Sequence, residues 1–159
     1  MPPEPLPAQR IEQVIRAYIK ACNDGDAAGI AACFHPDAVH YFPTSARWCG
    51  AFTIGANFVR RVHERGLYWT IDQLIIDTNR SSAALEWTQF NRQERILRGV
   101  DLFVFEPETL RINEVRPYTA ARLYPEDDRQ ELCEFDYAER GYPTARPVPD
   151  SKSGEGNKR

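Results

Sequence analysis

The chain has 159 residues, of which 42% are hydrophobic and 27% charged, the size and balance of one globular domain with a single core. A formal net charge of −3 gives no reason to expect a nucleic-acid or anionic-membrane partner. No apolar run approaches the roughly 20 residues that span a bilayer, and the opening MPPEPLPAQR lacks the features of a signal peptide, so we expect a cytoplasmic protein.

Helical spacing dominates the first part of the chain. Apolar residues recur every three or four positions over 11–22, which predicts an amphipathic helix. Asp26 is placed to cap a second helix that ends at residue 34. A third helix is predicted over 54–66, and its basic pair Arg60–Arg61 is interpreted as a solvated face. Between these helices we expect a short strand over 38–42 and then a loop.

From Leu67 onward the apolar period changes from 3.6 to 2, the alternation of β-strands. The stretches DTNRS, NRQER and EPET have turn compositions, so a meander of antiparallel strands is expected. The strands are predicted at 68–77, 82–91, 98–106 and 110–121. Helices followed by long strands indicate an α+β domain, in which three helices cover one face of a curved sheet and enclose an apolar space.

The core domain is predicted to span residues 9–123. Segments 1–8 and 150–159 have the composition of disordered tails. The extension 124–149 carries aromatic residues that predict docking onto the body. The four cysteines are scattered without a C-x-x-C pair, and the three histidines have no metal-ligand spacing. We therefore expect no disulfide framework and no metal.

One carboxylate, Asp101, interrupts the apolar strand in RGVDLFVFEPETL. Burying an ionised carboxylate without partners costs several kcal/mol, so such a group pairs, accepts hydrogen bonds or takes up a proton. The residues alone leave three interpretations open. Asp101 is an acid–base group inside the apolar space, a buried acid satisfied by Arg98 or Arg116, or a strand-edge carboxylate that faces solvent.

Two stretches, AYIKACNDGDAAGIAACFHPDAVHYFP and RGVDLFVFEPETLRINEVRPY, resemble the SnoaL-like polyketide cyclases and ketosteroid isomerases. These families belong to the nuclear transport factor 2-like superfamily of α+β cones. The resemblance covers roughly residues 10–121. It implies a cone with three N-terminal helices packed on a curved, mostly antiparallel sheet. It also implies a homodimer, in which a second copy covers outward residues such as Leu85, Trp87 and Leu102.

The resemblance also implies candidate catalytic residues. Tyr18 precedes a GD helix end and Asp101 stands in a G-x-D-x-F-x-F strand, the positions at which ketosteroid isomerases donate hydrogen bonds to a developing oxyanion. The isomerase general base is an Asp before a proline, where this chain has Phe42. A phenyl ring cannot abstract a proton. His40, two residues earlier and on the same strand face, is the candidate base.

The function that the resemblance implies is cofactor-independent proton transfer of the isomerase, dehydratase or cyclase type. The expected substrate is a hydrophobic, carbonyl-containing small molecule of the polyketide, steroid or terpenoid class. Arg116 would favour an anionic or carbonyl-bearing substrate if it entered the pocket instead of pairing with Glu114. The alternative function is a non-catalytic ligand-binding or protein-interaction module, which the missing carboxylate at Phe42 favours. The candidate substrate-binding residues are Phe42, Trp69, Trp87, Phe103 and Arg116.

Overall fold

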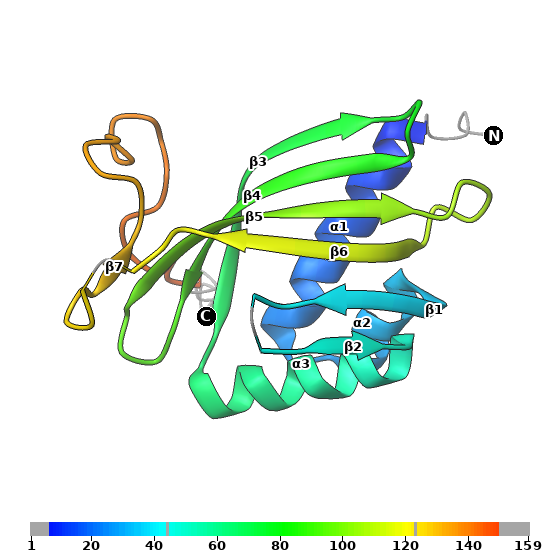
Figure 1. The fold of residues 1–159 in the computed structure, drawn as a ribbon, viewed down its shortest axis with the longest axis horizontal. Helices are drawn as coiled ribbons and strands as arrows, with labels where there is room; N and C mark the ends of the chain where they lie inside the picture. Colours follow the sequence, from blue (N-terminus) through cyan, green and yellow to red (C-terminus); the bar gives the residue numbers. More distant parts are fainter. Residues whose placement is uncertain (1–6, 44, 123, 150–159) are drawn as a thin grey trace, which may run out of the picture.

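Three helices pack against a curved, seven-stranded sheet in the computed structural model, which describes residues 7–43, 45–122 and 124–149 (Figure 1). The predicted α+β architecture is confirmed. The helices are α1 (Pro7–Asp24), α2 (Ala27–Cys33) and α3 (Ala51–Arg65). The strands are β1 (Phe34–Tyr41), β2 (Arg47–Cys49), β3 (Tyr68–Asp77), β4 (Ser82–Phe90), β5 (Ile96–Phe105), β6 (Ile112–Thr119) and β7 (Arg129–Gln130).

Helix α1 buries the apolar stripe that its spacing predicted, from Ile11 to Cys22, against the concave face of the sheet (Figure 1). It begins at Pro7, because a proline fits the first turn of a helix, where its missing N–H is not needed. The predicted tail 1–8 is therefore too long by two residues. The remainder of that tail, and the tail 150–159, lie outside the described residues.

The connection between α2 and α3 differs from the prediction in part. Asp26 caps α2 as expected, since its Oδ1 accepts a hydrogen bond from the Gly29 backbone at 2.9 Å. Strand β1 starts at residue 34 rather than 38, and the predicted loop 43–53 contains β2, which pairs antiparallel with β1. Three residues are too short a run to show the strand period. Helix α3 begins at Ala51, a buried residue, three positions earlier than predicted.

The sheet has the strand order β2-β1-β6-β5-β4-β3, with β7 paired to β5. Strands β3 to β6 form the predicted antiparallel meander, and β1 joins it by a parallel pairing with β6. Leu85 is paired with Asp101, and Trp87 with Gly99. Directly paired residues point to the same face of a sheet, so Leu85 and Trp87 face the concave side.

The expectation that Leu85 and Trp87 face outward is therefore wrong. Their exposed fractions are 0% and 4%, so they need no second copy of the chain to cover them. Leu102 does point to the opposite, outer face, where it is half-buried. The prediction had the correct alternation of side chains but assigned β4 the wrong face.

The extension 124–149 lies beyond β6 and packs at one end of the sheet (Figure 1). It contacts the outer face through polar side chains. Arg98 of β5 donates to the Glu131 carboxylate and to the Pro143 carbonyl, and Tyr142 donates to Glu86 of β4. None of the described residues of this extension lines the cavity that lies between α1, α3 and the concave face of the sheet.

Candidate active site

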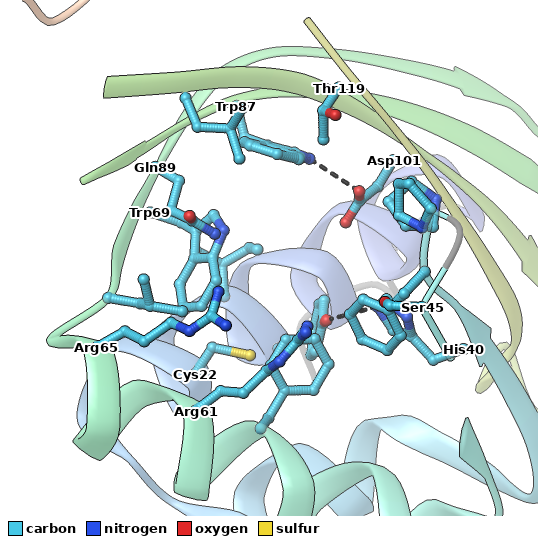
Figure 2. A pocket seen from close by; sticks show the side chains of 18 residues that line it. Cys22, His40, Ser45, Arg61, Arg65, Trp69, Trp87, Gln89, Asp101 and Thr119 are labelled. Atoms are coloured by element: carbon cyan, nitrogen blue, oxygen red, sulfur yellow. Dashed lines mark hydrogen bonds between the residues drawn. The ribbon is translucent and has the colours of Figure 1, made fainter. Parts of the chain in front are cut away.

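A cavity of about 260 Å³ lies between α1, α3 and the concave face of the sheet. Aromatic rings form much of its wall, contributed by Phe42, Phe58, Trp69 and Trp87. Polar side chains enter between these rings from several elements (Figure 2). They belong to Tyr18, Cys22, His40, Ser45, Arg61, Arg65, Gln89, Asp101 and Thr119.

Asp101 is held by the indole of Trp87, which donates from Nε1 to Oδ1 at 2.9 Å (Figure 2). Gly99 makes this contact possible. It is paired with Trp87 across the sheet, and a Cβ added at Gly99 would lie 2.4 Å from the indole ring and 2.8 Å from the Tyr118 carbonyl. The glycine of the G-x-D-x-F-x-F strand therefore provides the space in which the tryptophan reaches the aspartate.

The Asp101 carboxyl is buried, with 7% of the residue exposed, and it forms no ion pair with any described residue. Both arginines that might have satisfied it lie elsewhere. Arg98 points to the outer face, and Arg116 pairs with Glu114 at 3.1 Å. Burial raises the pKa of Asp101 from 3.8 to about 7, although the hydrogen bond from Trp87 lowers it in part. Asp101 can therefore exchange a proton near neutral pH.

Tyr18 lies on the cavity side of α1 and is 2% exposed. Its ring packs edge-on against the rings of Phe34, Phe58 and Phe103. Burial raises the pKa of Tyr18 well above its usual value of 10, and nearby groups including Cys22 and Asp101 raise it further. The phenol thus stays protonated and can act as a hydrogen-bond donor.

His40 is engaged at both ring nitrogens. Nδ1 lies 2.8 Å from the Tyr41 carbonyl oxygen, and Nε2 lies 3.4 Å from the Tyr18 hydroxyl. A carbonyl oxygen only accepts, so Nδ1 carries the proton and Nε2 accepts from Tyr18. Burial lowers the pKa of His40 to about 3, an effect that the Tyr41 carbonyl opposes and the charge of Arg61 reinforces.

This arrangement does not fit the expected role of His40 as the base. A group with so low a pKa has little affinity for a substrate proton near neutral pH, and its one lone pair already accepts from Tyr18. The predicted shared face of His40 and Phe42 is observed, since the two rings stack at 4.4 Å between centroids and both line the cavity.

The substrate-binding candidates divide into two groups. Phe42, Trp69 and Trp87 line the cavity. Phe103 and Arg116 do not, and these two predictions are corrected. Phe103 is 1% exposed and lies beneath the Tyr18 ring as part of the core. Arg116 lies on the outer face, because it is paired with the outward-facing Leu102.

Sequence reasoning missed the two arginines that do line the cavity, Arg61 and Arg65. Arg61 was assigned with Arg60 to a solvated face, but the helix turns by about 100° per residue. Arg60 is exposed whereas Arg61 is half-buried against the cavity. The sequence did contain a signal. Phe58 and Val62 are four residues apart on the apolar stripe, and Arg61 and Arg65 are four residues apart on the neighbouring stripe, which places the two arginines beside the buried face.

Other kinds of site were also considered. Among the residues that the structure describes, no group of three or more His, Cys, Asp or Glu is arranged to hold a metal ion. Within the same residues, no helix is long and apolar enough to cross a membrane. Cys22 and Cys33 are buried, and none of the four cysteines forms a disulfide.

The chain was compared with curated proteins, solved structures and protein families. No curated protein is significantly similar to the chain. A solved structure of a protein of unknown function with a cystatin-like fold, from Methylobium petroleophilum PM1, is 40% identical, with a TM-score of 0.68 over 89% of this chain and 95% of that chain.

Two further structures, each 18% identical with a TM-score of 0.59, show the fold alone. One is a candidate polyketide cyclase from Sinorhizobium meliloti, with 67% of this chain and 94% of that chain covered. The other is SalBIII, an epoxide hydrolase/cyclase-like enzyme in pyran ring formation in the polyether salinomycin, with 70% and 92% covered. The model of the SnoaL-like domain matches residues 15–115. Because this match spans more than half of the chain, including all three helices in part or whole and the Gly99–Asp101 strand, the chain belongs to the SnoaL-like family.

Proposed function

We propose that the chain is a cofactor-independent enzyme that moves a proton next to a carbonyl group in a hydrophobic small molecule. The observation that carries the proposal is Asp101. This carboxyl is buried, has a pKa of about 7, has no counter-charge among the described residues and opens into an aromatic cavity. A general acid–base group works best when its pKa lies near the operating pH, and perturbed carboxyls in clefts are typical of such groups.

The reaction begins with Asp101 in its ionised form. Its carboxylate takes a proton from the carbon next to the substrate carbonyl, and the electron pair of that C–H bond moves toward the carbonyl oxygen. Tyr18 donates its hydroxyl hydrogen bond to this oxygen as negative charge develops. In acyl-transfer enzymes, one such donor lowers the activation barrier by about 2.7–4 kcal/mol.

The second step decides the reaction type. Protonated Asp101 returns its proton to a different carbon in an isomerisation, or to a leaving hydroxyl, which departs as water, in a dehydration. In a ring closure the enolate carbon attacks a second carbonyl, whose oxygen takes the proton. All three outcomes use the same two side chains, so the shape of the substrate selects among them.

His40 and Trp87 are positioning residues in this scheme. Trp87 fixes Oδ1 of Asp101, which leaves Oδ2 without a hydrogen-bond partner among the described residues. His40 receives the Tyr18 hydroxyl at 3.4 Å, a long hydrogen bond. The hydroxyl therefore loses little when it turns toward a substrate oxygen. The neutral imidazole keeps a lone pair on Nε2 that accepts from the Tyr18 hydroxyl, which an imidazolium could not do.

The cavity volume narrows the substrate class. About 260 Å³ is slightly below the usual range for ligand pockets, roughly 300–1,000 Å³. This size favours a compact member of the polyketide, steroid or terpenoid classes. The aromatic rings of the wall suit an unsaturated or cyclic carbon skeleton.

The experiment is hydrogen–deuterium exchange of a panel of cyclic and linear ketones in D₂O, followed by NMR. We expect exchange of the proton next to the carbonyl to increase with pH and to level off above about 7, because the base must be ionised. Asp101→Asn should slow exchange by about 10²–10⁴-fold, and Tyr18→Phe by at least about tenfold.

Tyr41→Phe is the matched control, since Tyr41 is exposed and does not line the cavity. It should exchange at the wild-type rate. Unchanged exchange in Asp101→Asn would exclude this mechanism. If the wild-type protein exchanges no proton in any ketone, the chain is better described by the alternative that Phe42 favoured, a ligand-binding member of the fold.

A further inference from the structure

Arg61 and Arg65 stand one helical turn apart on α3 and line the cavity. In Figure 2 both side chains reach toward the cavity from the side opposite Asp101. Arg61 is half-buried and Arg65 lies nearer the solvent. The cavity thus has an acid at one end and two cations at the other, with Trp69 and Trp87 between them (Figure 2).

Neither guanidinium is neutralised within the described part of the chain. No ion pair and no side-chain hydrogen bond involves Arg61 or Arg65 there. Arg61 instead lies over two aromatic rings, 4.7 Å from the centroid of Phe42 and 5.2 Å from that of Trp48. Contact with a ring face holds the guanidinium plane but leaves its N–H donors available.

This arrangement of two cations is electrostatically unfavourable by itself. Like charges one turn apart on a helix repel each other, and partial burial removes water from Arg61. Burial and the charges of Arg65 and Arg60 lower the pKa of Arg61, and the charge of Glu64 opposes them only in part. Arg60, on the neighbouring stripe, shows the ordinary situation, since it is exposed and donates to Asn57. A bound anion would relieve both the repulsion and the missing hydrogen bonds.

We propose that Arg61 and Arg65 form a subsite for a carboxylate of the substrate, so that the enzyme acts on a carbonyl compound that is also an acid. This inference rests on the proposed function for the position of the reacting carbonyl, which lies at the Asp101 end. A carboxylate matches the parallel N–H donors of a guanidinium and is the smallest common group that does so. It therefore leaves most of the compact cavity to the carbon skeleton.

The subsite also orients the substrate. With its carboxylate at α3 and its skeleton between the tryptophans, the molecule points its other end toward Asp101 (Figure 2). Asp101 does not compete for the arginines, because it lies on the opposite side and bonds to Trp87. The two ends of the cavity can therefore be tested independently.

The test uses 3- and 4-hydroxybenzoate with their methyl esters as probes, measured by isothermal titration calorimetry. The phenol of each probe mimics an enolate, and only the acids carry the anion. At least one acid should bind the wild-type protein at least about tenfold more tightly than its ester, the size of effect expected for one charged hydrogen bond. Arg61→Met and Arg65→Met should each remove most of that preference, whereas Arg60→Met should keep it.

Each outcome decides the proposal. Equal affinity for acid and ester, no binding of either acid at millimolar concentration, or an equal loss in Arg60→Met would overturn it. Because Arg65 is exposed, its variant is expected to fold even if Arg61→Met does not. Asp101→Asn separates the two proposals. This variant should preserve the ratio of acid to ester affinity, because Asp101 does not contact the anion. If the wild-type protein prefers the acid but exchanges no proton, the proposed function is contradicted and the anion subsite is not.

Discussion

Strand β5 carries two buried charged residues, Asp101 and Arg98, whose surroundings differ sharply. Three positions apart, they point to opposite faces of the sheet, and they are 7% and 5% exposed. Arg98 donates to the Thr88 hydroxyl at 2.6 Å, to the Pro143 carbonyl at 2.9 Å and to Glu131 at 3.2 Å, with the Tyr137 ring 3.9 Å from its guanidinium carbon. Asp101 accepts one hydrogen bond, from an indole.

The difference in hydrogen-bond partners distinguishes a charge that stabilises the fold from a carboxyl that is left without a counter-charge. A buried charge that only supports the fold is paired and saturated with hydrogen bonds, since an unpaired one is costly. On the outer face the extension 124–149 supplies those partners. On the concave face nothing in the described chain does so for Asp101, which takes up a proton near neutral pH instead. Arg98 on the outer face is saturated with hydrogen bonds, whereas Asp101 on the concave face borders a cavity.

The largest effect expected from this contrast is on the pH dependence of stability. The pKa of Asp101 is about 7 in the folded state against 3.8 for the ordinary side chain. The folded protein therefore binds this proton more tightly than the unfolded chain does. Protonated Asp101 adds to the free energy of unfolding at low pH, and this contribution is lost as the pH rises from about 4 to 7. The loss amounts to up to about 4 kcal/mol. Asp101→Asn should gain stability over the wild type across this range, in urea unfolding followed by circular dichroism.

His40 provides an internal check with the opposite sign. Its folded pKa is about 3 against 6.5, so the unfolded chain binds this proton more tightly, and stability is lost as the pH falls below about 6.5. The two residues oppose each other in the wild type between about pH 4 and 6.5. In Asp101→Asn the His40 trend should emerge without the opposing contribution of Asp101. A constant stability difference between variant and wild type over this range would contradict the environment assigned to Asp101.

The second effect concerns the outer face. Arg98→Met should lower the free energy of unfolding by about 3 kcal/mol, because it leaves Glu131 and the Thr88 hydroxyl without their main partner. Proton exchange by the folded variant should be unchanged, since Arg98 does not line the cavity. The matched control is Arg116→Met, which breaks a surface ion pair with Glu114 and should cost less than about 1 kcal/mol. Equal losses in the two variants would refute the contrast.

The smallest effect concerns the strand between the two charges. Gly99→Ala places a methyl group against the Trp87 ring and the Tyr118 carbonyl, and such overpacking costs typically about 1–3 kcal/mol. The displaced indole should no longer hold Asp101, so the pKa of the carboxyl should rise above about 7. NMR titration of the Asp101 carboxyl would detect the change. An unshifted titration would show that the indole contributes nothing to the environment of the acid.

Much of the fold followed from local patterns in the sequence. The stripe of α1, the Asp26 cap and the meander of β3 to β6 were all predicted, because each depends on spacing within one element or on a turn between neighbours. Asp101 was singled out as an acid in an apolar strand, and the resemblance added Tyr18 and the catalytic role of both. Both residues line the cavity. The register between β4 and β5 was not readable from either strand alone, and this is why Leu85 and Trp87 were assigned to the wrong face.

The parts that were missed depend on contacts between distant residues. Arg98 finds Glu131 and Pro143 at separations of 33 and 45 positions, which no periodicity reveals. Arg61 was interpreted as a surface charge, because a helix face that borders a cavity can have the same composition as one that borders water. Arg116 was a substrate-binding candidate only if it entered the pocket. It pairs instead with Glu114, the other interpretation that the sequence left open.

The tryptophans give the cavity a further property. The chain has three; Trp69 and Trp87 line the cavity, and Trp48 packs against Phe42 at its wall. Nearly all intrinsic fluorescence of the protein therefore originates around this one hollow, and one of the emitting indoles is bonded to Asp101. Ionisation of that carboxyl, or arrival of a ligand, should alter the emission of the unlabelled protein, so the site carries its own optical reporter.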